Sequence, residues 1–151
     1  MYNFMLGFLG SLCPAVLFNI ERKNLVWSGL SGACGWMVFI LAKQKTGSMV
    51  ISTFFGAIIV SLYSEIMARV LKTPASVFSI VGIFPLLPGV WVYNTLLQLV
   101  LGDYKKAFNT GLSTLGMTCS IAFGLMLVSA AFQSYTNIKN YLQSNKLNKI
   151  K

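Results

Sequence analysis

Two prolines three residues apart interrupt a long apolar run in the segment GIFPLLPGVWVYN. Because proline donates no backbone hydrogen bond, Pro85 and Pro88 are expected to free the carbonyl groups of Val81 and Phe84. They are also expected to move the residue before each proline, Phe84 and Leu87, away from helical backbone angles. Such a break inside an apolar run survives only where it faces protein or a water-filled cavity.

The residues that follow the break are suited to bind an anion. If a helix restarts at Pro88, the N–H groups of Gly89, Val90 and Trp91 lack a partner one turn earlier. Together they give the helix start about half a positive charge. Gly89 lets a ligand approach the backbone closely, and Tyr93 and Asn94 carry hydrogen-bond donors. The pattern predicts a substrate-binding site formed by Pro85, Pro88, Gly89, Tyr93 and Asn94. A proline kink stabilised by neighbouring helices remains the alternative.

Glu65 is the only acid that falls inside a predicted span, and Arg69 follows it four residues later. This spacing places both side chains on one helical face, in the favourable order of acid before base. One interpretation is an ion pair at the membrane interface, with an arginine that reaches toward the headgroups. The other makes Glu65 and Arg69 a proton-coupling or substrate-coupling site, because ionisable groups inside membranes are costly and often functional.

The composition is typical of a polytopic membrane protein. Of 151 residues, 56% are hydrophobic and 10% are charged, and the mean hydropathy is +0.70. A soluble domain has roughly a quarter charged residues. The chain has no histidine. Its three cysteines lie in different apolar runs, and their spacing fits no metal-binding motif. We therefore expect no enzyme activity, no metal and no cofactor.

We predict an all-α fold with five transmembrane helices, the fourth broken at the Pro-Leu-Leu-Pro-Gly motif. A crossing helix needs about 20 mostly apolar residues. The runs that fit are residues 2–20, 25–42, 48–68, 76–101 and 108–132. Residues 1–132 then form a single transmembrane domain. Residues 133–151 form a basic cytoplasmic tail, which either lies on anionic lipid or is simply solvated.

Basic residues are divided unequally between the two predicted sides. The richer side has eight: Arg22, Lys23, Arg69, Lys72, Lys139, Lys146, Lys149 and Lys151. The other side has four: Lys43, Lys45, Lys105 and Lys106. The richer side is normally cytoplasmic, so we expect the N-terminus outside and the C-terminus inside. This topology also accounts for the net charge of +9 without a nucleic-acid partner.

Small residues mark one face of every predicted span except the fourth. In lipid such faces allow helices to pack closely. Alternatively, some of their hydroxyls line a substrate path, with the fifth span as the first candidate. The residues are Gly7, Gly10, Ser11 and Pro14; Ser28, Gly32 and Gly35; Thr53, Ala57, Ser61, Ser64 and Ala68; and Asn109, Ser113, Gly116, Ser120 and Gly124.

The run ARVLKTPASVFSIVGIFPLLPGVWVYNTL resembles the signature of the threonine/serine exporter (ThrE) family, in its small, C-terminal-type (YjjB-like) half. The matching positions are Arg69, Pro74, Gly82, Pro85, Leu86, Pro88, Gly89 and Tyr93. The segment FNIERKNLVWSGLSGACGWMVF is similar to the second hydrophobic segment of that family, including Gly32 and the Gly35–Trp36 pair. The resemblance extends over roughly residues 4–132.

The resemblance implies a multi-pass exporter of small amino acids in the bacterial inner membrane, driven by the proton gradient. Split members are associated with export of succinate-type dicarboxylates. Longer relatives join a second half to this one, which implies a second membrane subunit as partner, with homo-oligomerisation as the competing option. An odd number of spans also suits one unit of an inverted pair. A non-transporting scaffold subunit is the alternative function. A lipid-modifying enzyme would need clustered acids or histidines, which this chain lacks.

Overall fold

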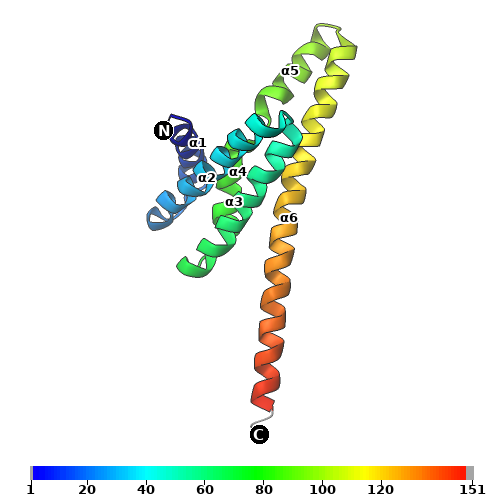
Figure 1. The fold of residues 1–151 in the computed structure, drawn as a ribbon. Helices are drawn as coiled ribbons and strands as arrows, with labels where there is room; N and C mark the ends of the chain where they lie inside the picture. Colours follow the sequence, from blue (N-terminus) through cyan, green and yellow to red (C-terminus); the bar gives the residue numbers. More distant parts are fainter. Residues whose placement is uncertain (1, 149–151) are drawn as a thin grey trace.

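The computed structural model describes the backbone of residues 2–148 and the side chains of residues 2–138, and this part of the chain is all-helical, as predicted. Figure 1 shows α1 to α4 gathered in one cluster, with α6 running past it and α5 folded back against the beginning of α6. The elements are α1 (Tyr2–Leu17), α2 (Arg22–Thr46), α3 (Met49–Leu71), α4 (Ser76–Ile83), the 3-10 turn η1 (Phe84–Leu86), α5 (Gly89–Val100) and α6 (Tyr104–Asn148).

Three helices are long and apolar enough to cross a bilayer: α2, α3 and α6 as far as Ile138. The segment formed by α4 and η1 reaches that length only together with α5, and the two parts are bent by 50°. α1 has 16 residues, which corresponds to about 24 Å of helix against about 30 Å of hydrocarbon. The structure thus supports three spans, or four if the bent pair is one span. Five spans remain a prediction.

The last helix is longer than the predicted fifth span. α6 continues without interruption past residue 132 to Asn148, so the predicted tail begins inside a helix. A left-handed glycine, Gly102 with a φ of 78°, lies in the turn between α5 and α6. The basic side chains that were assigned to the tail lie outside the described side chains: Lys139, Lys146, Lys149 and Lys151.

Glycines allow α2, α3 and η1 to pack at short distance. A methyl group added at Gly35 of α2 would meet Val60 of α3 and lie 3.4 Å from the carbonyl oxygen of Gly56. One added at Gly56 would lie 2.9 Å from Leu86 of η1. Because lipid provides no hydrophobic drive between helices, such close contacts supply the packing energy. Gly35 and Gly56 are therefore points of close contact between helices.

α6 packs on α3 through a face that includes only part of the predicted one, since Gly116 and Gly124 lie against α3. Asn109 and Ser113, which open the predicted small-residue stripe, are exposed, and Gly124 is the one member that is buried. The side chains buried along this face, three or four residues apart, are Thr114, Met117, Ile121 and Gly124. Larger side chains thus form half of the contact, which a search for small residues could not reveal.

Candidate functional site at the broken helix

The chain between α4 and α5 tightens, straightens and then restarts as a helix. η1 covers Phe84–Leu86, with Pro85 as its second residue. Leu87 is extended, with a φ of −62° and a ψ of 131°. Pro88 precedes the first residue of α5, Gly89. Proline cannot continue the hydrogen-bond ladder of α4, so the break falls where the two prolines place it.

Two sequence-based expectations about this break are wrong. The carbonyl of Val81 accepts a hydrogen bond from the N–H of Phe84, and that of Phe84 accepts one from Leu87 at 3.3 Å. Both carbonyls are therefore satisfied, because a 3-10 turn pairs each N–H with the residue three positions earlier. Phe84 also keeps helical angles, with a φ of −50° and a ψ of −44°. Of the two residues before the prolines, Leu87 alone leaves the helical region.

The first turn of α5 leaves N–H groups open, although not the predicted set. Gly89 donates to the carbonyl of Leu87 at 2.9 Å, and Val92 donates to Pro88 at 3.0 Å. The latter is the first α-helical bond of α5, so the N–H groups of Val90 and Trp91 precede the ladder and have no carbonyl one turn earlier. Gly89 is exposed, and a methyl group added there would have no neighbour within 4 Å. A ligand can therefore approach this helix start.

A cavity of about 230 Å³ lies against this helix start. Five elements, α2, α3, η1, α5 and α6, meet around it, which makes it the place where the broken run faces protein. Its walls are mostly apolar, and neither an acid nor a base contributes to them. The lining residues are Trp36, Phe39, Met49, Thr53, Pro85, Leu86, Leu87, Pro88, Gly89, Val90, Trp91 and Met117.

The indole of Trp36 adds a donor that has no partner. Its Nε1 is buried and makes no hydrogen bond within the described part of the chain. The ring stacks on Phe39 with centroids 5.1 Å apart, which fixes its orientation. The hydroxyl of Thr53, which also lines the cavity, donates to the carbonyl of Met49 at 3.0 Å or of Val50 at 2.9 Å. An unsatisfied buried donor is costly and marks a position where a ligand acceptor would be favourable.

Three of the five predicted substrate residues, Pro85, Pro88 and Gly89, line this cavity, and the other two do not. Tyr93 exposes 63% of its surface, and Asn94 is half-buried on α5 outside the cavity wall. The sequence analysis also missed the wall that α2, α3 and α6 provide. Trp36 belongs to a family pattern and Thr53 to a small-residue face. Neither sequence signal indicates that these residues lie near the break.

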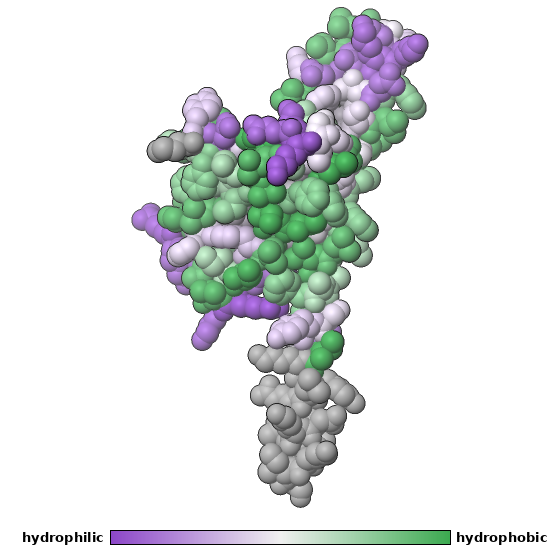
Figure 2. Space-filling view, in the orientation of Figure 1, coloured by the Kyte–Doolittle hydropathy of each residue, from purple (hydrophilic) through white to green (hydrophobic). Residues whose placement is uncertain are grey.

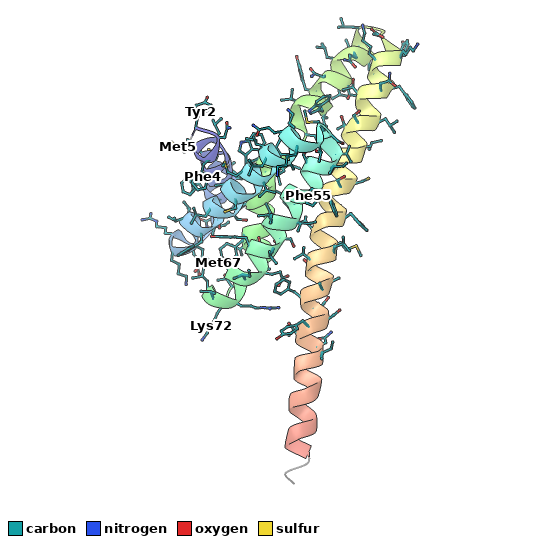
Figure 3. The ribbon with its side chains drawn as sticks, viewed as in Figure 1. Tyr2, Phe4, Met5, Phe55, Met67 and Lys72 are labelled. Atoms are coloured by element: carbon teal, nitrogen blue, oxygen red, sulfur yellow. The ribbon has the colours of Figure 1, made fainter. Side chains whose placement is uncertain are left out.

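Glu65 and Arg69 lie together, as their spacing predicts, but not at the cavity. Their side chains are 3.9 Å apart and are 19% and 45% exposed respectively. Arg69 also donates to Thr136 at 3.1 Å and lies 4.5 Å from the ring centre of Phe132. Glu65 is twelve residues beyond Thr53 on α3, or about 18 Å along the helix. Figure 3 labels Lys72 at this same end of α3, which is remote from the α2–α3 turn.

Groups that could hold a metal ion are absent from the described residues. No three histidine, cysteine, aspartate or glutamate side chains lie close together there. Cys13, Cys34 and Cys119 are free thiols on three different helices. The polar chemistry of the cavity therefore comes from hydrogen-bond donors.

Comparisons with known proteins identify the family of the chain. The family model described as "Threonine/Serine exporter, ThrE" matches residues 3–131. A protein of Haemophilus influenzae, described as uncharacterized, is 21% identical over 140 residues, which is 87% of this chain and 47% of that protein. The chain thus spans about half the length of this relative. No solved structure matches this chain. On the family match, the chain belongs to the threonine/serine exporter family, ThrE.

Proposed function

We propose that the chain is a membrane subunit of a proton-coupled exporter of threonine, serine or related small carboxylates, including dicarboxylates such as succinate. In this proposal it works together with a second membrane subunit. The observation that carries the proposal is the cavity at the start of α5, which is lined by Gly89, Val90 and Trp91 and also by Trp36, whose buried Nε1 has no partner within the described residues. All the substrates implied by the family carry a carboxylate, which accepts hydrogen bonds from such donors.

The substrate carboxylate would lie against the first turn of α5. Its oxygens would accept hydrogen bonds from the N–H groups of Val90 and Trp91 and from Nε1 of Trp36. Gly89 has no side chain and leaves this approach open. The apolar walls from Phe39 and Met117 would face the rest of a small substrate. Because no lysine or arginine lines the cavity, binding would be weak enough to permit release, which a transport cycle requires.

We propose Glu65 as the proton-coupling residue. Its side chain is 19% exposed, against 64% for Glu21 and 40% for Asp103, the other two acids. It is thus the most buried acid of the chain and lies on α3, which also contributes Met49 and Thr53 to the cavity. A shift of α3 would connect Glu65 to the cavity, and Arg69 lies 3.9 Å from the carboxylate of Glu65.

The proposed topology has five crossings in the bacterial inner membrane. The bent pair of α4 and α5 would form one discontinuous crossing of the kind that binds carboxylates in several transporter folds. α1 would cross with the apolar residues that follow it, since Phe18 and Ile20 extend its run. The N-terminus would lie outside and the C-terminus in the cytoplasm, according to the unequal distribution of basic residues.

The variant Gly89→Leu tests the substrate site. A leucine there would cover the open helix start, so threonine efflux from cells fed with threonine-containing dipeptides should fall at least tenfold while the protein level and its assembly stay unchanged. Ala122→Leu is the matched control, because Ala122 is exposed on α6 and lies outside the cavity. Unchanged efflux with Gly89→Leu would reject the site. Loss of assembly would instead favour a scaffold role.

A further inference from the structure

The hairpin formed by α5 and the beginning of α6 exposes an apolar surface. Within the described part of the chain, α6 is the only helix against which α5 packs extensively, and no residue of α5 is buried. Large apolar side chains on both helices are therefore largely exposed. Those that expose 57% or more of their surface include Val90, Tyr93, Leu96, Val100, Tyr104, Phe108, Leu112 and Leu115.

This hairpin extends beyond the level at which α2 and α3 end. A methyl group added at Gly116 of α6 would lie 3.2 Å from Val50, so Gly116 is level with the α2–α3 turn. The basic residues near that turn are Lys43 and Lys45. The basic residues of the hairpin tip begin at Lys105, eleven residues before Gly116, or about 16 Å farther along α6. Figure 2 shows hydrophilic atoms at both levels, with mostly hydrophobic or neutral surface between them.

A lipid bilayer alone cannot accommodate basic residues at both heights, near the α2–α3 turn and at the hairpin tip. If the membrane edge lies at Lys43 and Lys45, the apolar hairpin stands in water, where a patch of this kind marks an interaction site. If the edge lies at the hairpin tip, the two lysines lie about 16 Å below it. There they would need a water-filled space enclosed by protein, since a lysine in hydrocarbon costs about 2.5 kcal/mol or more. Both placements require a protein surface beside the hairpin.

The charges of this side argue against a second copy of the chain as that protein. Four lysines lie here, Lys43, Lys45, Lys105 and Lys106, against one acid, Asp103. Copies inserted in the same orientation would bring their four lysines to the same side and repel one another. The Haemophilus influenzae relative, by contrast, has roughly as much chain outside the matched region as inside it, because this chain spans 47% of it. That additional half needs a surface on which to pack.

We propose that the α5–α6 hairpin is the docking surface for the second membrane subunit, the counterpart of the half of the longer relatives that this chain does not span. This inference rests on the proposed two-subunit exporter. The partner would offer an apolar helical face to Leu96 and Leu112, and acidic residues to the lysines at the turn and the tip. It would also close the cavity at the start of α5, because Val90 belongs both to the hairpin surface and to the cavity wall.

Site-directed photo-cross-linking tests this surface. A benzophenone amino acid is placed at Leu96 or at Leu112 in the full chain, expressed at its native level in its own host. The control position is Val16 of α1, which is 63% exposed but lies outside the hairpin. The adducts are identified by mass spectrometry, and threonine efflux is measured from the same cells.

We expect adducts at both hairpin positions, and none at Val16, with a polypeptide that matches the uncovered half of the longer relatives. Adducts with lipid alone, or of twice the chain mass of 16.6 kDa and containing only this chain, would overturn the proposal. The efflux measurement separates the two proposals. The expected adduct without carboxylate export would keep the docking surface and reject the proposed function. Carboxylate export without that adduct would keep the proposed function and reject the docking surface.

Discussion

Replacing Trp36 with phenylalanine tests whether the indole N–H binds the carboxylate of the substrate. Nε1 of Trp36 is buried and unpartnered within the described residues, and the ring stacks on Phe39 with centroids 5.1 Å apart. Phenylalanine retains an aromatic ring for this stacking and removes the donor. The fold should therefore persist while the substrate loses one hydrogen bond.

The expected magnitude follows from the energy of that bond. A hydrogen bond to a charged group contributes about 1.5–3 kcal/mol, and each 1.4 kcal/mol corresponds to about a factor of ten in affinity. Trp36→Phe should thus raise the apparent KM for export roughly 10-fold to 150-fold. If the bond persists from the bound state to the transition state, kcat should change little.

Initial efflux rates, measured against the internal threonine concentration, provide the assay. Trp27→Phe is the matched control, because Trp27 is 39% exposed and does not line the cavity. It should leave the KM unchanged. An unchanged KM in Trp36→Phe, with normal protein levels, would refute the assignment of the indole as a substrate donor.

Three further predictions concern packing, coupling and pH. Gly35→Ala should destabilise the protein by about 1–3 kcal/mol through overpacking between α2 and α3, measured by thermal unfolding in detergent. Gly10→Ala, whose added methyl would make an ordinary 3.6 Å contact, should be neutral, and equal effects would contradict this packing. Glu65→Gln should abolish the dependence of export on external pH, and unchanged rates and pH profiles would remove Glu65 from coupling. Hydrogen bonds from Lys106 lower the pKa of Asp103 below its ordinary value of 3.8, so its stabilising contribution is complete above that value and is lost as pH falls below it. Asp103→Asn should therefore weaken the acid-induced loss of thermal stability, and an identical pH profile would contradict it.

Local sequence was sufficient to predict the break and its place. Proline chemistry is a property of the residue itself, so Pro85 and Pro88 indicated an interruption before α5. Composition likewise predicted an all-helical chain with long apolar helices. The hydrogen bonds that satisfy the carbonyls at the break were not predictable in the same way, because they depend on the conformation of the preceding turn. The 3-10 turn that satisfies the carbonyls of Val81 and Phe84 is such a conformation.

The cavity itself depends on contacts between segments far apart in the chain. Trp36, Thr53 and Met117 come from three different helices and meet only when these helices pack together. Tyr93 and Asn94 were predicted as donors because they follow the break closely in sequence, but neither lines the cavity, and Tyr93 is 63% exposed. The sequence also did not predict that Lys43 and Lys45 lie at a different height along α6 from Lys105 and Lys106. A topology prediction assigns these lysines to one side of the membrane but gives no distance from it.

Protection of a cysteine at position 89 tests the central claim most directly. In a variant carrying Gly89→Cys, with Cys13, Cys34 and Cys119 replaced by serine, the rate of maleimide labelling is measured with and without threonine. If the start of α5 binds the carboxylate, saturating threonine should slow the labelling at least severalfold, whereas threonine amide, in which an uncharged amide replaces the carboxylate, should not. Equal labelling rates with and without threonine, in a variant that still exports it, would contradict the account.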